Sequence, residues 1–320
     1  AGIGRHRDRP QFDTVAGLSL LSSCPFRFRP RTGERWERAT LRPAPRSAYV
    51  LTGPARTAWE HSIPPVEAFR RLAGRPGAFW LDSSLPRRGD GRFSIMGCAP
   101  RSVFTAVATA WRIDCDGLIL EQGAEAPLRR LEALIESRRV APPAGSELPF
   151  WGGAVGRFSY DLGRQFEAVP VAAQEDFAVP DIRLAWHDAA IVWDHHRETC
   201  WLVGVGWERD AREAIAELAA WLELPPSDLA LPAPPGRTAF AADLGRKGYV
   251  DGVRRIRAGI ARGEIYQVNL AERFTCEQSE PPAVTYLRLR ELNPAPFAMF
   301  QDAGELAVLG SSPERFFEVA

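Results

Sequence analysis

Segments with the residue pattern of β-strands follow one another along this chain, with few helices between them. Residues 93–99, 102–110 and 111–120 alternate between apolar and other side chains, the last of them around a Cys-Asp-Gly turn. A period of two places the apolar side chains on one face of a strand. Strands that succeed each other without a helical crossover pair as antiparallel neighbours. The pattern therefore predicts an α+β fold with antiparallel sheets and argues against a doubly wound parallel sheet.

The remaining elements follow from the same periodicities. Further strands are predicted at residues 78–81, 184–193, 199–205, 265–274, 297–301 and 306–309. Helices are predicted at residues 65–73, 127–138, 211–222, 247–263 and 286–291. In the helix at 247–263, the apolar face is predicted to consist of Tyr249, Val253, Ile256 and Ile260. The strands at 184–193 and 199–205 are expected to form a hairpin.

Composition shifts along the chain predict its domains. Residues 1–46 hold ten arginines, and we interpret them as a disordered or non-native leader rather than as a nucleic-acid-binding arm. An N-terminal domain is expected at residues 47–230 and a proline-rich linker at 231–242. The start of a second, incomplete region is expected at 243–320. Because the first methionine is Met96 and residues 316–320 have the pattern of a continuing strand, we expect a fragment.

Charge and cysteine content exclude several classes of function. The formal net charge is zero, so nothing in the overall charge attracts nucleic acid or a membrane surface. The five cysteines form no CxxC pair, which argues against a zinc site and against a disulfide framework. No apolar run reaches the roughly 18 residues needed to span a bilayer. A cytoplasmic protein is the simplest expectation.

Two motifs are better explained by structure than by chemistry. The glycines of residues 152–156 lack the ending of a phosphate-binding loop, so we expect them to allow close backbone approach in a strand. His195 and His196 are adjacent, and adjacent side chains in a strand point to opposite faces. A solvated hairpin turn is therefore favoured there over a metal site.

Two other segments could present polar groups to a ligand. Residues 81–85 and 89–94 join strand ends through a loop with glycines and hydroxyl groups. Residues 311–316 (SSPERF) place Glu314 after a proline, which fixes the backbone and can aim a carboxylate for acid–base work.

Several motifs, in order, resemble one family. Residues 263–270 (GEIYQVNL), 293–297 (NPAPF) and 312–316 (SPERF) resemble the chorismate-binding enzymes, and most of all their aminodeoxychorismate synthase component I branch. Residues 152–164 resemble the family's GG…GYDLGR segment. The resemblance runs from about Phe69 to Ala320.

The resemblance implies a fold and a set of site residues. The fold it implies is α+β, with two antiparallel sheets packed face to face, helices outside, and a truncated C-terminal side. It implies Glu314 as an active-site carboxylate. It also implies a pocket for a bound tryptophan, with matching residues Ser83, Asp90, Gly91, Arg92, Phe93, Pro296, Phe297 and Ala298.

A reaction and its partners follow from the same resemblance. Chorismate would be aminated to 4-amino-4-deoxychorismate, on the route to 4-aminobenzoate and folate, with ammonia from a glutamine amidotransferase partner. Mg²⁺ would hold the substrate, with ligands downstream of these residues. The family's nucleophilic lysine also lies downstream, and Lys247, the one lysine here, does not match it. The 320 residues alone are therefore expected to be inactive.

Two alternatives remain open. Anthranilate synthase component I shares the fold and related motifs, although Asn269 favours the aminodeoxychorismate branch. A tryptophan-binding regulatory module without catalysis is the alternative of another class.

Overall fold

A computed structural model describes residues 65–319, apart from residues 86–90, 169–176, 208, 228, 230–238 and 279. Before residue 65 it describes only the backbone of short strands. These are β1 (Val15–Ser19), β2 (Phe26–Thr32), β3 (Arg35–Trp36), β4 (Ala39–Leu41), β5 (Ser47–Leu51) and β6 (Trp59–Ser62). Two compact units result, one of Ala1–Leu229 with Tyr286–Ala320 and one of Ala230–Thr285. The predicted leader, residues 1–46, contains β1 to β4. Most of the predicted linker at 231–242 lies outside the described residues. The predicted domain limits stay predictions.

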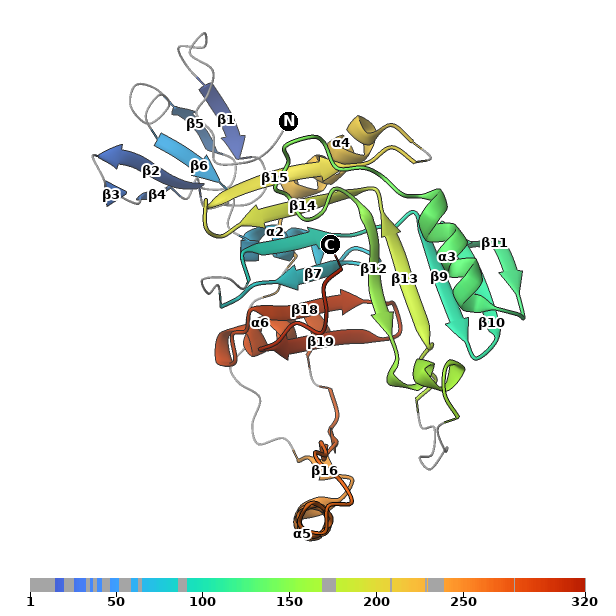
Figure 1. The fold of residues 1–320 in the computed structure, drawn as a ribbon. Helices are drawn as coiled ribbons and strands as arrows, with labels where there is room; N and C mark the ends of the chain where they lie inside the picture. The colour runs from blue at the N-terminus through green and yellow to red at the C-terminus, as the bar shows by residue number, and fades with distance from the viewer. Residues whose placement is uncertain are drawn as a thin grey trace. The chain divides into compact units, whose positions relative to one another are not determined.

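The first unit contains a six-stranded antiparallel sheet (Figure 1). Its strand order is β15-β14-β8-β7-β18-β19. The strands are β7 (Phe79–Asp82), β8 (Phe93–Gly97), β14 (Ala189–Asp194), β15 (Thr199–Gly204), β18 (Phe297–Asp302) and β19 (Ala307–Ser312). Because β18 pairs with β7, residues more than 200 positions apart in the sequence become neighbours.

Among the described residues, three helices cover this sheet: α2 (Pro65–Leu72), α4 (Ala211–Glu223) and α6 (Pro282–Leu292). Of these, α2 and α6 do so through an aromatic core. The ring of Phe69 on α2 lies 4.9 Å from that of Trp80 and 5.1 Å from that of Phe300. Tyr286 of α6 completes the cluster. Each such side chain contributes roughly 1.5–3 kcal/mol when it leaves water, so this cluster fixes α2 and α6 on the sheet.

A five-stranded antiparallel sheet forms the other layer of the unit. Its order is β11-β10-β9-β13-β12, and all its neighbouring strands are antiparallel. The strands are β9 (Ser102–Val107), β10 (Ala110–Cys115), β11 (Leu118–Gly123), β12 (Gly153–Phe158) and β13 (Ile182–His187). A short 3-10 helix at Tyr160–Gln165 follows β12.

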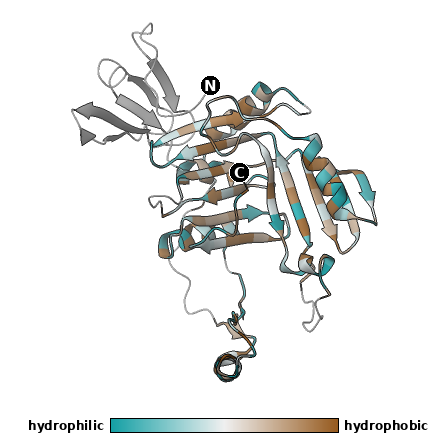
Figure 2. Ribbon diagram, viewed as in Figure 1, coloured by the Kyte–Doolittle hydropathy of each residue, from teal (hydrophilic) through white to brown (hydrophobic). Residues whose placement is uncertain are grey.

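Helix α3 (Pro127–Ser137) covers one face of this sheet. Its Leu131 and Leu134 pack with Phe104, Ile182 and Leu184 in a buried cluster. Figure 2 shows hydrophobic and hydrophilic segments on the same helix, as its amphipathic sequence predicts. The predicted α+β class, with two antiparallel sheets and helices outside, is confirmed.

The two sheets touch through named side chains. The ring of Phe79 on β7 lies 4.5 Å from that of His187 on β13. The side-chain amide of Gln301 on β18 donates to the carbonyl of Val155 on β12 at 3.5 Å. The layers are therefore in direct contact within the first unit.

The predicted single strand at residues 184–193 is wrong, because the chain changes sheets in the middle of it. Strand β13 belongs to the five-stranded sheet and β14 to the six-stranded sheet, with Asp188 between them. Asp188 is buried, and Arg209 binds its carboxylate from Nε at 2.6 Å and from Nη2 at 3.1 Å. The apolar run continues on both sides because both strands are buried, so periodicity alone does not reveal the break. The hairpin of β14 and β15 is as predicted.

The predicted strand at residues 265–274 is also wrong. Among the described residues of the second unit, β17 (Phe274–Thr275) pairs with β16 (Ala241–Ala242), and residues 265–273 form no strand. A strand needs a neighbour for its backbone N–H and C=O groups, and the described residues of this unit offer none to 265–273. Residues 316–319, the described part of the continuing strand predicted at 316–320, likewise have no strand pairing.

Helix α5 (Gly245–Ala261) confirms the predicted helix but not its predicted face. Tyr249 and Ile260 are 38% and 45% exposed. The buried positions are Gly252 and Gly259. A Cβ atom there would meet the side chains of Leu270 and Ile265 at 2.9 and 3.1 Å. The following segment therefore packs on the small residues of the helix.

Among the glycines of residues 152–156, Gly156 shows most clearly the predicted close backbone approach. It lies on β12 opposite Leu184 of β13. A Cβ atom at Gly156 would be 1.9 Å from the carbonyl oxygen of Arg183. Only a residue without a side chain allows this contact.

We predict that Gly156→Ala separates β12 from β13 and lowers the free energy of unfolding by about 2–4 kcal/mol. Urea denaturation followed by tryptophan fluorescence measures the change. Gly163→Ala is the matched control, because a Cβ atom at Gly163 meets nothing within 4 Å. Equal stability of the two variants would contradict the close approach.

Candidate functional site

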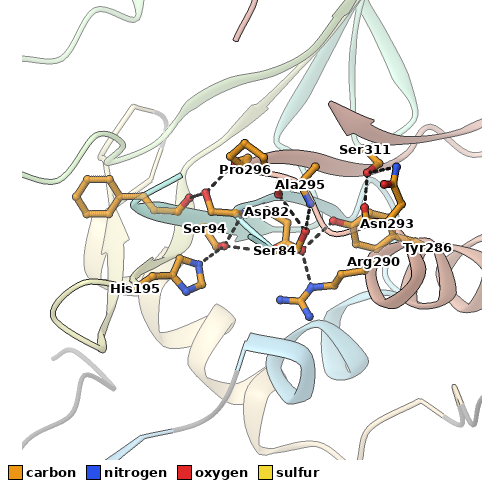
Figure 3. A network of polar contacts seen from close by, with 12 residues as sticks. Asp82, Ser84, Ser94, His195, Tyr286, Arg290, Asn293, Ala295, Pro296 and Ser311 are labelled. Carbon is orange, nitrogen blue, oxygen red and sulfur yellow. Dashed lines mark hydrogen bonds and ion pairs between the residues drawn. The ribbon is translucent and has the colours of Figure 1, made fainter. Parts of the chain in front are cut away.

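A buried carboxylate lies at the centre of a polar network in the first unit (Figure 3). Asp82 ends β7, and its side chain is 0% exposed. Its Oδ2 accepts hydrogen bonds from Arg290 Nε at 2.6 Å and from the Tyr286 hydroxyl at 3.1 Å. Its Oδ1 accepts one from the Ser94 hydroxyl at 3.1 Å. One carboxylate thus connects β7, β8 and α6.

Burial and hydrogen bonding act on Asp82 in opposite directions. Burial raises the pKa of its carboxyl, and the charge and bonds of Arg290 act to lower it. Burial and the neighbouring Asp82 charge raise the pKa of Tyr286, so its hydroxyl keeps its proton and donates it. The Arg290 guanidinium also lies 5.0 Å from the centre of the Trp80 ring. Arg290, itself partly shielded from solvent, thus supplies the positive charge that compensates the Asp82 carboxylate.

His195 extends this network beyond the sheet. Its Nε2 lies 2.7 Å from the Ser94 hydroxyl oxygen. Burial, together with the positive charge of Arg290, lowers the pKa of His195 to about 4, so the ring is neutral at neutral pH. Ser94 has one proton, which it donates to Asp82, so we infer that His195 Nε2 carries a proton and donates it to Ser94.

Ser83 joins three strands that the sequence separates widely. Its hydroxyl lies 2.7 Å from the Phe93 carbonyl oxygen and 3.1 Å from that of Pro296. Its backbone N–H donates to the Ser94 hydroxyl at 3.0 Å. Three residues predicted for the tryptophan pocket, Ser83, Phe93 and Pro296, are therefore brought together.

Gly91 and Arg92 flank this junction. Gly91 has a φ of +68°, and a Cβ atom there would lie 3.1 Å from Pro296. The Arg92 guanidinium binds Asp194 at 2.7 Å and Glu147 at 3.0 Å, and lies 4.6 Å from the centre of the Phe93 ring. Arg92 is thus already engaged by two carboxylates. Asp90, predicted for the same pocket, lies outside the described residues.

The loop before β18 is held against the end of β7. The Ala295 N–H donates to the Ser84 hydroxyl at 2.8 Å, and that hydroxyl lies 3.0 Å from the Ala295 carbonyl oxygen. Asn293 and Ser311 are hydrogen-bonded to each other across the same loop. Ala298 is then in register with Asp82. The guanidinium of Arg315 lies 5.2 Å from the centre of the Phe297 ring. The predicted residues Phe297 and Ala298 thus begin the strand beside the network.

Glu314, the predicted catalytic carboxylate, does not take part in this network. It is exposed, and the structure joins it to Ser312 through its backbone N–H and carbonyl groups. Its side chain has no role in the contacts described above.

Sequence reasoning missed Ser94, His195, Tyr286 and Arg290 as members of this site. Tyr286 and Arg290 are four residues apart on α6, which places both donors on one helix face, and that spacing could have indicated them. The turn at residues 195–198 is as predicted, but of its two histidines only His196 is exposed. The expectation of a solvated His195 is wrong, because the ring folds back onto Ser94.

No helix among the described residues is both long and apolar enough to cross a membrane. In the same part of the chain, no three His, Cys, Asp or Glu side chains gather where they could hold a metal ion.

Comparison with known proteins gives a consistent relationship. The family described as chorismate binding enzyme matches residues 82–320. Aminodeoxychorismate synthase component 1 of Klebsiella aerogenes is 33% identical over 256 residues, covering 78% of this chain and 54% of the relative. Anthranilate synthase component 1 of Thermus thermophilus is 32% identical over 255 residues, covering 78% of this chain and 53% of the relative.

A solved structure agrees with these matches. The crystal structure of anthranilate synthase component I from Streptococcus pneumoniae TIGR4 superposes with a TM-score of 0.54 at 26% identity, covering 70% of this chain and 50% of that one. The chain spans about half the length of the curated relatives it matches.

We predict that His195 makes the folded chain less stable in acid. Its pKa of about 4 lies below the ordinary 6.5, so between these values the unfolded chain binds a proton that the folded chain does not. The free energy of unfolding therefore falls as pH is lowered through this window, and His195→Gln should reduce the fall by about 2–3 kcal/mol. Urea denaturation at a series of pH values measures it.

His196→Gln is the matched control, since His196 is the exposed neighbour in the same turn. An unchanged pH dependence in His195→Gln would show that His195 does not remain neutral on folding.

Proposed function

The chain belongs to the family of chorismate binding enzymes, and from this premise we propose that its protein is an aminodeoxychorismate synthase component I. The proposed reaction converts chorismate and ammonia to 4-amino-4-deoxychorismate, on the route to 4-aminobenzoate and folate. The observation that carries the proposal is the match across residues 82–320, together with the YQVNL motif of residues 266–270.

Overall identity does not choose between the two branches of the family. The aminodeoxychorismate and anthranilate relatives reach 33% and 32% identity over nearly equal lengths. Asn269, within the YQVNL motif, is the residue that favours the aminodeoxychorismate branch. Anthranilate synthase component I is therefore the second candidate.

The proposal includes partners and a cofactor of the whole protein. The component 1 names of the relatives support a second component, and we propose a glutamine amidotransferase that supplies ammonia. Mg²⁺ is proposed as the cofactor. The described residues offer no cluster that fits it, so no step is assigned to it here. A cytoplasmic location is part of the same proposal.

Lys247 is not proposed as the nucleophile of the reaction. It lies in the first turn of α5, its side chain is 94% exposed, and its Nζ pairs with Asp251 at 3.0 Å. An exposed ammonium in a surface ion pair lacks the desolvated pocket in which a lysine nucleophile is activated. Glu314, exposed in this structure, is proposed to act in catalysis.

The junction around Ser83 is proposed to hold a tryptophan molecule. Ser83, Gly91, Phe93 and Pro296 are adjacent there, and the buried charge of Asp82 fixes the backbone on which they stand. Phe93 and Phe297 offer aromatic surface, while the Ser83 hydroxyl offers a polar contact. A regulatory module that binds tryptophan without catalysis would use the same residues.

Complementation distinguishes the candidate reactions. We predict that the whole gene, rather than one encoding these 320 residues alone, restores growth without 4-aminobenzoate to a bacterium lacking its own aminodeoxychorismate synthase component I. Restored growth without tryptophan in a host lacking anthranilate synthase component I would identify the second candidate. Failure in both hosts, with the protein present in soluble form, would contradict both enzymatic proposals.

Calorimetry tests the tryptophan proposal separately. We predict that the chain binds L-tryptophan, and that Gly91→Val weakens binding at least about tenfold, because its side chain would strain the backbone and press on Pro296. Gly304→Val is the control, since Gly304 also has a positive φ but meets nothing within 4 Å. No heat with millimolar tryptophan would contradict an intact pocket.

A further inference from the structure

A row of cationic side chains crosses four neighbouring strands of the five-stranded sheet. Arg157 on β12 is in register with Arg183 on β13. Arg183 is in register with Thr105 on β9, which in turn is in register with Arg112 on β10. We call these four residues the cationic row.

The row lies on the sheet face that α3 does not cover. Ile182 and Leu184, on either side of Arg183 in the sequence, belong to the cluster that packs against α3. Because side chains alternate between faces along a strand, Arg183 and its partners in register point the other way.

Two of the three arginines have shielded nitrogens without a hydrogen-bond partner among the described residues. Arg112 Nε pairs with Asp114 at 3.0 Å. By contrast, Arg157 Nε and Nη1 and Arg183 Nη1 are shielded from solvent and have no hydrogen-bond partner in the described part of the chain. Like charges directly opposite each other on neighbouring strands destabilise a sheet, so this arrangement is costly as it stands.

The surroundings of the pair do not offset that cost. Burial lowers the pKa of Arg157 and of Arg183, and the charge of Arg157 lowers that of Arg183 further. The carboxylates of Asp302 and Asp114 act on Arg183 in the opposite direction, without a hydrogen bond to it. For Arg157, burial alone accounts for the lowered pKa. The shielded nitrogens of these half-buried arginines are desolvated without a hydrogen bond in return, and a bound anion would supply the missing acceptors.

The row is bordered by hollows of suitable size. Arg183 lines one of about 560 Å³, together with Arg101, Arg209 and the carboxylates of Asp114, Asp116, Glu217 and Asp302. Arg101 pairs with Asp116 and Arg209 with Glu217, so two of these carboxylates are already compensated. Thr105 and Arg112 line another of about 680 Å³. Volumes in this range accommodate small molecules. Planar guanidinium groups with a hydroxyl between them suit carboxylate or phosphate oxygens, which accept paired N–H bonds.

We propose that the cationic row binds a small multivalent anion bearing carboxylate or phosphate groups, with Arg157 and Arg183 as its principal ligands. This site is separate from the Ser83 junction and does not depend on the proposed reaction. The anion supplies the acceptors that the shielded nitrogens lack.

Thermal unfolding at constant ionic strength tests the proposal. Inorganic phosphate and malonate are compared with chloride, each at about 10 mM, and the multivalent anions are expected to raise Tm by about 2–4 °C. Stabilisation by malonate alone would assign a carboxylate ligand, and stabilisation by phosphate alone a phosphate ligand. Isothermal titration calorimetry with the stabilising anion gives the affinity directly.

Two variants and a control make the test specific. Arg157→Met removes an unpaired charge and is expected to fold, yet to lose the anion-dependent rise in Tm. Thr105→Val, which keeps the charge, is expected to weaken binding several-fold. Arg129→Met, on the exposed surface of α3, should respond like the unaltered chain. Equal Tm in phosphate, malonate and chloride, or an undiminished rise in Arg157→Met, would overturn the proposal.

Discussion

The site depends on the hydrogen bonds that the buried carboxylate of Asp82 accepts. A carboxylate withdrawn from water is tolerated only when donors surround it, and here Ser94, Tyr286 and Arg290 supply them from β8 and α6. Removing the Ser94 hydroxyl would take from Oδ1 the donor described for it, whereas Oδ2 has two donors. The carboxylate thus fixes the end of β7, the start of β8 and the last turns of α6 in one arrangement, and Ser83 and the loop before β18 are built on it.

Two buried aspartates organise the first unit in different ways. Asp82 holds the elements of the six-stranded sheet together, while Asp188, bound by Arg209, marks the point where the chain passes from one sheet to the other. The cationic row shows the opposite situation, because shielded nitrogens of Arg157 and Arg183 have no hydrogen-bond partner in the described part of the chain. The same rule of charge compensation explains the first two sites and motivates the proposed anion at the third.

The motifs that identify the family are not the residues that organise the described fold. The YQVNL segment carries the resemblance, yet it forms no strand among the described residues of its unit. Glu314 is exposed, whereas Tyr286 and Arg290, which belong to none of these motifs, donate hydrogen bonds to the buried Asp82 carboxylate. A motif can consist of residues that take part in chemistry. The residues that hydrogen-bond to a buried charge are instead determined by their positions in the fold. Sequence patterns therefore indicate the family more readily than they indicate the hydrogen-bond network around Asp82.

The sequence by itself determined the local elements and the family. Periodicity and breakers predicted α2, α3, α4, the strands from β7 to β11 and the β14–β15 hairpin, because these depend on neighbours a few residues away. Only the tertiary structure decided the sheet change at Asp188, the absence of a strand at residues 265–273 and the inward position of His195. Each of these depends on a partner distant in sequence: Arg209 for Asp188, a pairing strand for the backbone groups, and Ser94 for the imidazole. Hydrogen-bond partners of this kind are set by packing, which local periodicity does not encode.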